Sequence, residues 1–228
     1  MINKCLFPAA GYGTRFLPAT KAVPKEMLPI INKPLLQYGV EEALSANINN
    51  MAIVTGRGKR SIEDHFDNAF ELESQLNGSP NEHYLDDIKS VIERSTFTYI
   101  RQRQMLGLGH AILTGEPLIG NEPFAVILAD DLCDCGENGL TSQMIEIYKK
   151  YQCSVIAVEE VPFSQIKRYG VMFGDLIEGI QKVLDTMLRI YHTLCSNHCT
   201  DTDPVSFMRG NFRFQNFSAR EIPTLASR

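Results

Sequence analysis

The chain has 228 residues, of which 44% are hydrophobic and 21% are charged, so it is long enough to form one substantial domain with a packed core. Its net charge of −5, with no compensating basic tract, argues against nucleic acid as the main partner. No apolar run approaches the roughly 18–20 residues of a membrane span, and the N-terminus lacks a signal-peptide pattern. We therefore expect a cytoplasmic protein without a membrane partner, whose six cysteines are reduced.

Short apolar runs alternate with amphipathic segments along the first 160 or so residues, and this alternation predicts the secondary structure. The expected strands are 4–8, 51–55, 96–100, 124–128 and 154–161. The expected helices are 35–46, 61–66 (with Ser61 as its N-cap), 70–76, 85–94, 108–118 and 140–151. A strand–loop–helix order of this kind predicts an α/β fold with three layers around a mostly parallel sheet.

The loop after the first expected strand carries the clearest chemical signal in the chain. It contains Gly11 and Gly13, soon followed by Arg15 and Lys25. Small residues let backbone N–H groups approach phosphate oxygens, and cationic side chains neutralise those oxygens. The loop lacks the Gly-Lys-Ser/Thr of a Walker loop and the third glycine of a dinucleotide fingerprint. A strand-to-helix turn would explain the glycines but not the cations, so we predict polyphosphate binding.

Polar side chains also follow two later strands of the expected sheet. Gln102 comes after the third strand and Asp130 after the fourth. Because ligands bind at the carboxyl ends of parallel strands, we expect the loop, Gln102 and Asp130 to form one site. An amide can match both the donor and the acceptor atoms of a uracil edge, and a carboxylate that faces phosphates is a natural Mg²⁺ ligand. The alternative to metal binding is that Asp130 forms a turn, which is the more common role of an aspartate considered alone.

These segments resemble the signature motifs of the sugar-1-phosphate nucleotidyltransferases, G-x-G-T-R-x-x-P followed by P-K-x-x-L-P. The matching residues are Gly11, Gly13, Thr14, Arg15, Pro18, Pro24, Lys25, Leu28 and Pro29. Three later segments (61–73, 101–111 and 125–130) resemble the bacterial UTP–glucose-1-phosphate uridylyltransferases in particular. The resemblance covers about residues 3–174.

The resemblance implies a Rossmann-like nucleotidyltransferase fold and the conversion of UTP and glucose 1-phosphate to UDP-glucose and pyrophosphate with Mg²⁺. It implies that Arg15 and Lys25 are catalytic, by stabilising the leaving group and contacting the phosphates, and that Asp130 binds the metal. The implied substrate-binding residues are Ala10, Gly11, Gly13, Thr14, Glu26, Gln102, Gly107 and Gly170. For Glu26, a helix-surface residue is the alternative. His110 heads an expected helix and is interpreted as structural, because the attacking sugar phosphate is already an anion and needs no base.

The resemblance stops after about residue 179. The family would continue with Val-Glu-Lys-Pro and later Asp-Cys-Gly segments, which are associated with the sugar phosphate and a second metal carboxylate, and neither segment occurs in this chain after residue 179. We therefore predict a nucleotidyltransferase domain over 1–179, incomplete at its C-terminus, and a divergent tail over 180–228, in which 183–191 has a helix-like pattern. A frame change or truncation near residue 180 is the preferred explanation, and a short variant with a different lid is the second.

Several functional interpretations stay open from the sequence alone. The chain is interpreted as a UTP–glucose-1-phosphate uridylyltransferase whose UTP binding persists while sugar transfer falls by orders of magnitude, because alignment of the sugar phosphate is lost. The alternatives are a non-catalytic uridine-nucleotide-binding remnant, another sugar-1-phosphate nucleotidyltransferase, or an aggregation-prone fragment with unpaired strand edges. Whether the chain forms a homo-oligomer is left open.

Overall fold

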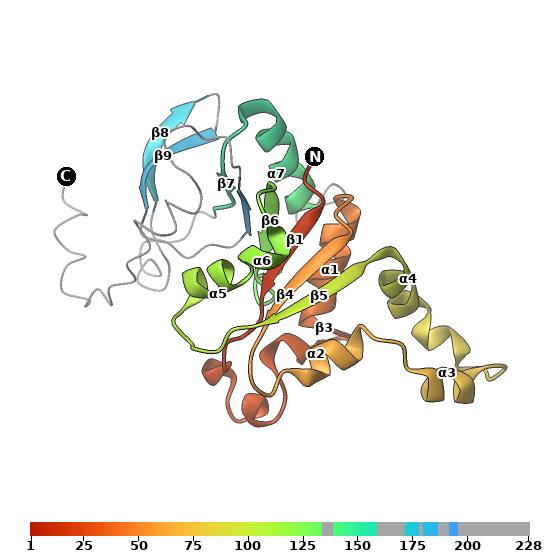
Figure 1. Cartoon of the computed structure of the whole chain (residues 1–228). Coiled ribbons are helices and arrows are strands. Elements are labelled where there is room, and N and C mark those ends of the chain that lie inside the picture. Colours follow the sequence, from red (N-terminus) through yellow and green to blue (C-terminus); the bar gives the residue numbers. More distant parts are fainter. Residues whose placement is uncertain (134–138, 159–171, 178–179, 187–191, 196–228) are drawn as a thin grey trace.

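The computed structural model describes residues 1–133, 139–158, 172–177, 180–186 and 192–195. Its centre is a six-stranded sheet with the strand order β5-β4-β1-β6-β10-β7 (Figure 1). The parallel strands are β1 (Lys4–Pro8), β4 (Asn50–Thr55), β5 (Thr96–Arg101) and β6 (Phe124–Ile127). Strand β10 (His192–Cys195) runs antiparallel to both β6 and β7 (Val155–Ile156). The prediction of a mostly parallel sheet is confirmed.

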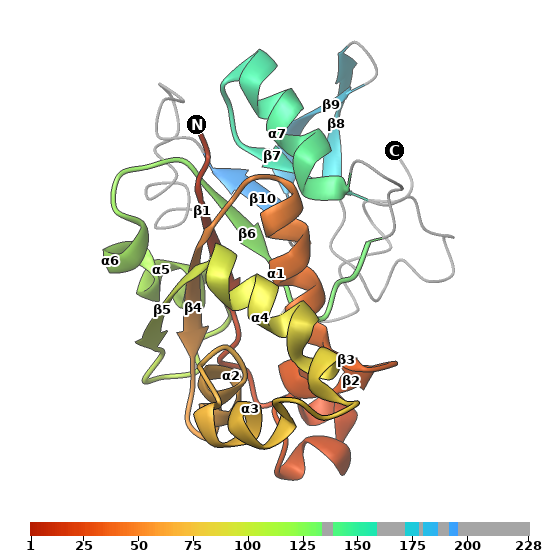
Figure 2. The ribbon, with the colours of Figure 1, turned by 90° about the vertical axis from the view of Figure 1, so that its right-hand side faces the viewer.

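Helices cover both faces of this sheet, which gives the three predicted layers (Figure 2). One face is covered by α1 (Leu35–Ser45), α2 (Arg60–His65), α4 (Asp86–Arg94) and α7 (Leu140–Tyr151). The opposite face is covered by α5 (Leu108–Thr114) and α6 (Glu116–Ile119). The remaining helical segments are α3 (Phe70–Leu76) and the short 3-10 turns Thr14–Phe16, Ala19–Lys21, Lys25–Met27 and Glu82–Leu85. None of the helices in the described ranges is both long and apolar enough to cross a membrane.

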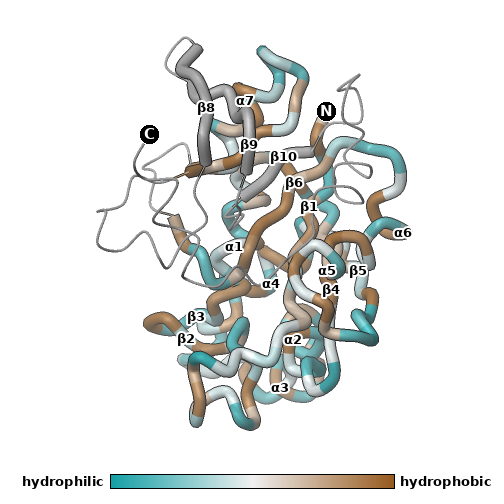
Figure 3. The backbone as a smooth tube through the Cα atoms, turned by 90° about the vertical axis from the view of Figure 1, so that its left-hand side faces the viewer, coloured by the Kyte–Doolittle hydropathy of each residue, from teal (hydrophilic) through white to brown (hydrophobic). Residues whose placement is uncertain are grey.

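The core has two halves because successive side chains of a strand point to opposite faces of the sheet. In β1, Cys5 and Phe7 pack toward α1, whereas Leu6 packs toward α5, and all three are buried. This explains why β1 has a continuous apolar run instead of an alternating pattern. The central strands accordingly form the hydrophobic centre of the molecule (Figure 3).

Two smaller antiparallel pairs complete the described structure. Strands β2 (Pro29–Ile30) and β3 (Lys33–Pro34) form a hairpin after the glycine-rich loop, and β8 (Met172–Ile177) pairs with β9 (Ile180–Thr186). The helix-like interpretation of residues from 183 onward is therefore wrong where the chain is described, because cross-strand pairing with β8 overrides the local pattern. The division of the chain at residue 179 stays a prediction.

Two other local expectations are corrected by the structure. Ser61 lies inside α2, whose N-cap is Lys59, and no side chain caps this helix. The single helix expected over 108–118 is divided at Gly115 into α5 and α6. A Cβ atom at Gly115 would lie 2.5 Å from the Cδ1 atom of Leu6, so a side chain at this break would require the buried Leu6 or the helix to shift.

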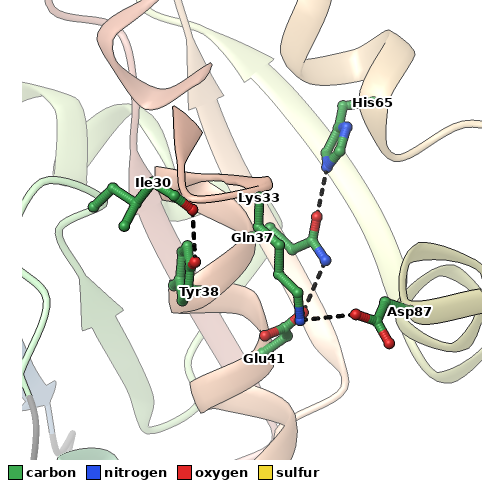
Figure 4. A network of polar contacts seen from close by, with 7 residues as sticks. All are labelled: Ile30, Lys33, Gln37, Tyr38, Glu41, His65 and Asp87. Carbon is green, nitrogen blue, oxygen red and sulfur yellow. Dashed lines mark hydrogen bonds and ion pairs between the residues drawn. The ribbon is translucent and has the colours of Figure 1, made fainter. Parts of the chain in front are cut away.

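A polar network joins the β2–β3 hairpin to three helices (Figure 4). The Nε2–H group of His65 in α2 donates to Gln37 Oε1 at 3.0 Å, and Gln37 Nε2 donates to Glu41 Oε1 at 2.8 Å, both in α1. Lys33 Nζ in the hairpin lies 3.0 Å from Glu41 Oε1 and 3.1 Å from Asp87 Oδ2 in α4. Burial lowers the pKa of His65, which favours the neutral imidazole. The network therefore fixes the segment that directly follows the predicted phosphate-binding residues.

Candidate active site

The glycine-rich loop after β1 folds back on itself and brings its two ends together. Gly13 has a φ of 65°, a conformation that residues with a side chain rarely adopt. A Cβ atom at this position would also lie 3.1 Å from Lys25 Cβ, and the hydroxyl of Thr20 donates to the Gly13 carbonyl at 2.7 Å. Gly13 is thus required both by its φ angle and by the close approach of Lys25.

The same loop packs directly against the carboxyl end of β4. The Ala9 N–H group donates to the Val54 carbonyl at 2.9 Å. A Cβ atom at Gly56 would lie only 2.7 Å from the Ala10 carbonyl oxygen, so Gly56 lets the predicted substrate-binding residue Ala10 approach the sheet. Gly56 was not predicted to belong to the site, although its position directly after the expected strand 51–55 is a signal in the sequence.

The predicted catalytic and metal-binding side chains meet at the carboxyl end of the sheet. Lys25 Nζ lies 2.7 Å from Asp130 Oδ1, and Arg15 Nη2 lies 3.5 Å from Asp130 Oδ2. The side chains of Lys25 and Asp130 are only 15% and 20% exposed, whereas that of Arg15 is 64% exposed. Residues from the loop after β1 and from the segment after β6 therefore form one charged cluster, as the topology predicts.

The electrostatics of this cluster keep Asp130 ionised at neutral pH. Burial alone would raise the pKa of Asp130, but the hydrogen bond and charge of Lys25, together with the charge of Arg15, hold it below its usual value. An ionised carboxylate beside a phosphate-binding loop suits a divalent cation that shares its ligands between one carboxylate, phosphate oxygens and water. Within the described ranges, no group of three or more His, Cys, Asp or Glu side chains could hold a metal.

The predicted base-recognition residues also come together, at the carboxyl end of β5, which β4 separates from β1. The Gln102 N–H group donates to the Thr55 carbonyl at 2.9 Å, and the Gln102 side chain is buried. Its amide Nε2 lies 3.2 Å from the Gly107 carbonyl oxygen and 2.8 Å from His110 Nδ1. Gly107 has a φ of 97°, so this position also favours glycine. His110, which the sequence analysis interpreted as structural, is thus in direct contact with Gln102.

Glu26 occupies a buried position beside the cluster. Its Oε2 atom lies 2.5 Å from Lys59 Nζ, and both side chains are almost completely buried. The alternative of a surface glutamate is therefore wrong. Burial raises the pKa of Glu26 against the opposing effect of the Lys59 charge, and Glu26 Oε1 has no hydrogen-bond partner among the described residues. Because Glu26 directly follows Lys25 in the chain, this ion pair anchors the segment after the glycine-rich loop to the start of α2.

Removing one partner of this buried ion pair is expected to destabilise the protein strongly. Lys59→Met leaves the Glu26 carboxylate buried without its counter-ion, and such a loss costs about 3–5 kcal/mol of unfolding free energy. The double variant Glu26→Gln/Lys59→Met removes both charges, so we expect it to recover much of this loss. Chemical denaturation followed by circular dichroism measures all three free energies. If Lys59→Met unfolds at the wild-type denaturant concentration, the ion pair does not anchor the loop.

The remaining predicted substrate-binding residues are Gly11, Thr14 and Gly170. Gly11 and Thr14 are in the glycine-rich loop, and a Cβ atom at Gly11 would have no protein atom within 4 Å. The backbone at Gly11 is thus not covered by other described parts of the chain. Gly170 lies outside the described residues. Its assignment to the substrate site stays a prediction.

Comparisons with known proteins agree with this geometry. Residues 6–185 match the family model described as nucleotidyl transferase. Two UTP–glucose-1-phosphate uridylyltransferases of Pseudomonas aeruginosa are 60% identical to the chain over 187 and 189 residues, which are 81% and 82% of this chain and 67% and 68% of the relatives. A protein of the same name from Staphylococcus epidermidis is 49% identical over 178 residues, which are 78% of this chain and 62% of the relative. The chain thus spans about two thirds of the length of these relatives.

Solved structures show the same similarity in three dimensions. An apo-UDP-glucose pyrophosphorylase superposes with a TM-score of 0.81 and 53% identity, over 86% of this chain and 77% of that chain. A UDP-glucose pyrophosphorylase complexed with UDP-glucose superposes with a TM-score of 0.77 and 51% identity, over 86% and 76% of the two chains. From its motifs, its fold and these similarities, the chain belongs to the nucleotidyl transferase family and, within it, to the UTP–glucose-1-phosphate uridylyltransferases.

Proposed function

We propose that this chain binds UTP and glucose 1-phosphate and forms UDP-glucose and pyrophosphate. The observation that carries the proposal is the cluster of Arg15, Lys25 and Asp130 at the carboxyl end of the sheet, with Gln102 after β5 in the same parallel sheet. The names of the relatives, and the UDP-glucose bound to one similar structure, support the same substrates.

The reaction joins two polyanions, so charge neutralisation and alignment are its main requirements. A phosphate oxygen of glucose 1-phosphate forms a bond to the α-phosphorus of UTP, and the bond between that phosphorus and the bridging oxygen of pyrophosphate breaks. The guanidinium of Arg15 stabilises the charge that develops on the leaving pyrophosphate. The ammonium of Lys25 contacts the phosphates next to the reacting centre. The attacking phosphate is already an anion, so no side chain has to accept a proton.

The ion pairs with Asp130 hold both cations near the reaction centre before the substrate binds. This preorganisation lowers the cost of ordering them around the phosphates. We assign Asp130 to a divalent cation, which we propose to be Mg²⁺, and this cation would supply further neutralisation of the phosphate oxygens.

Calorimetric titration of the chain with UTP and with ATP, each in Mg²⁺ buffer, tests the nucleotide assignment. We expect one binding site and clearly tighter binding of UTP, because the amide of Gln102 can match a uracil edge and the ATP base presents a different pattern. Equal affinities for the two nucleotides would contradict the assignment of Gln102 to base recognition.

A non-catalytic uridine-nucleotide-binding protein is the second candidate function, because the family's Val-Glu-Lys-Pro segment is absent from the sequence. It predicts UTP binding without UDP-glucose formation. The expected loss of turnover by orders of magnitude stays a prediction, which a side-by-side assay with a Pseudomonas aeruginosa relative would measure. The cytoplasmic location, the absence of a nucleic-acid partner and the oligomeric state also stay open to direct measurement.

A further inference from the structure

The orientation of the Gln102 side-chain amide is determined by its neighbours. The Gly107 carbonyl oxygen can only accept hydrogen bonds, so the Gln102 atom that faces it at 3.2 Å is the amide nitrogen Nε2. His110 Nδ1 lies 2.8 Å from the same nitrogen, and this ring atom therefore accepts the second amide hydrogen. Such a hydrogen bond requires that Nδ1 carries no proton and that the ring proton is on Nε2.

These two contacts use both hydrogens of the Gln102 amide. The remaining polar atom, Oε1, receives no hydrogen bond from the described part of the protein. His110 itself is held in place, because it lies in α5, where its carbonyl accepts from the Thr114 hydroxyl at 2.7 Å. Among the residues that the structure describes, these contacts leave the Gln102 side chain with Oε1 as an acceptor in a fixed position.

We propose that His110 is a positioning residue that makes the site selective for uracil over cytosine by fixing Gln102 Oε1 as an acceptor. This inference rests on the proposed function, because it assumes that Gln102 meets the base. Uracil carries a hydrogen on N3, which Oε1 can accept. Cytosine has no hydrogen on N3, and its N3 atom is itself an acceptor that would face Oε1 unfavourably. An amide free to turn would present a donor to cytosine instead, and the hydrogen bond to His110 opposes that rotation.

Two substitutions of His110 separate this role from a merely structural one. His110→Leu introduces an apolar side chain of similar size and removes the acceptor, whereas the Oδ1 atom of His110→Asn can accept in place of Nδ1. The measured quantity is the ratio of the dissociation constants for CTP and UTP, obtained by calorimetric titration in Mg²⁺ buffer. We expect His110→Leu to lower this ratio by about tenfold, the effect of one hydrogen bond, and His110→Asn to retain most of it.

The Gln102→Leu background tests whether His110 acts through Gln102. In that background we expect His110→Leu to have no further effect on the CTP-to-UTP ratio, because the amide that it orients is gone. A full additional effect there, or a wild-type ratio in the single variant His110→Leu, would overturn the inference. If the unmodified chain does not bind UTP more tightly than CTP, the proposed function fails. If the unmodified chain prefers UTP and His110→Leu prefers it equally, only the role of His110 is contradicted.

Discussion

Replacing Arg15 with alanine is expected to abolish measurable UDP-glucose formation, and Lys25→Ala is expected to reduce it severely. One charge-assisted hydrogen bond to phosphate contributes about 1.5–3 kcal/mol, so a loss of roughly tenfold to a hundredfold is the minimum. The loss for Arg15 is expected to be larger, because its interaction strengthens as charge develops on the leaving pyrophosphate. Initial rates of UDP-glucose formation at saturating substrates measure the effect.

Because Arg15 is exposed, a loss of activity on its substitution can be distinguished from a loss of stability. Arg15 is 64% exposed, so Arg15→Ala is expected to leave the free energy of unfolding almost unchanged. Lys21 lies in the same loop and is exposed, so Lys21→Ala is the matched control for the loss of one positive charge. Arg15→Lys keeps the charge but loses the planar, bidentate grip, and an intermediate rate is expected. Wild-type UTP binding and turnover in Arg15→Ala would show that the loop does not bind the phosphates.

Asp130→Asn is the second substitution with a large expected effect. The amide keeps the shape of the side chain but removes the charge that pairs with Lys25 and Arg15 and that we propose to bind the metal. We expect loss of activity that added Mg²⁺ does not restore. The neighbouring Asp131→Asn is the control, since it removes one negative charge at the adjacent position of the chain. Full activity of Asp130→Asn in chelator-treated buffer would contradict the role of Asp130.

The same carboxylate links stability to pH. The folded-state pKa of Asp130 is lowered, so the unfolded state binds its proton more readily than the folded state. The resulting stability is fully present above the unfolded-state pKa of about 4 and is lost as the pH falls through the lower, folded-state pKa. Asp130→Asn removes this contribution, so we expect the variant and the wild type to differ in unfolding free energy at neutral pH and to converge in strong acid.

Much of the fold was predictable because its signals are local. The first strand and the helix over 140–151 match the structure at both ends, since continuous apolar runs and amphipathic spacing depend only on neighbouring residues. The division of the expected helix at Gly115 has a local signal, because Pro117 stands in the first turn of α6 and proline is disfavoured in a helix interior. The strand β9 was not predictable from the local pattern, because it depends on its pairing with β8.

The site shows the same difference between local and long-range information. The convergence of Arg15, Lys25 and Asp130 follows from the rule that the carboxyl ends of parallel strands meet at one edge. The partner of Glu26 could not be predicted, since Lys59 lies 33 positions away in the sequence and the residues around it give no sign of burial. The contact between His110 and Gln102 was hidden because the spacing of 8 residues spans a loop, whose conformation the pattern does not specify.

Formation of UDP-glucose from UTP and glucose 1-phosphate is the most direct test of the central claim, that this chain transfers a uridylyl group. Both products are quantified over time by anion-exchange chromatography in Mg²⁺ buffer, with Arg15→Ala as the inactive control. We expect equal amounts of UDP-glucose and pyrophosphate from the wild type, with no product from the variant or from reactions in which the metal is chelated. Absence of both products from a folded wild type that binds UTP would contradict the claim.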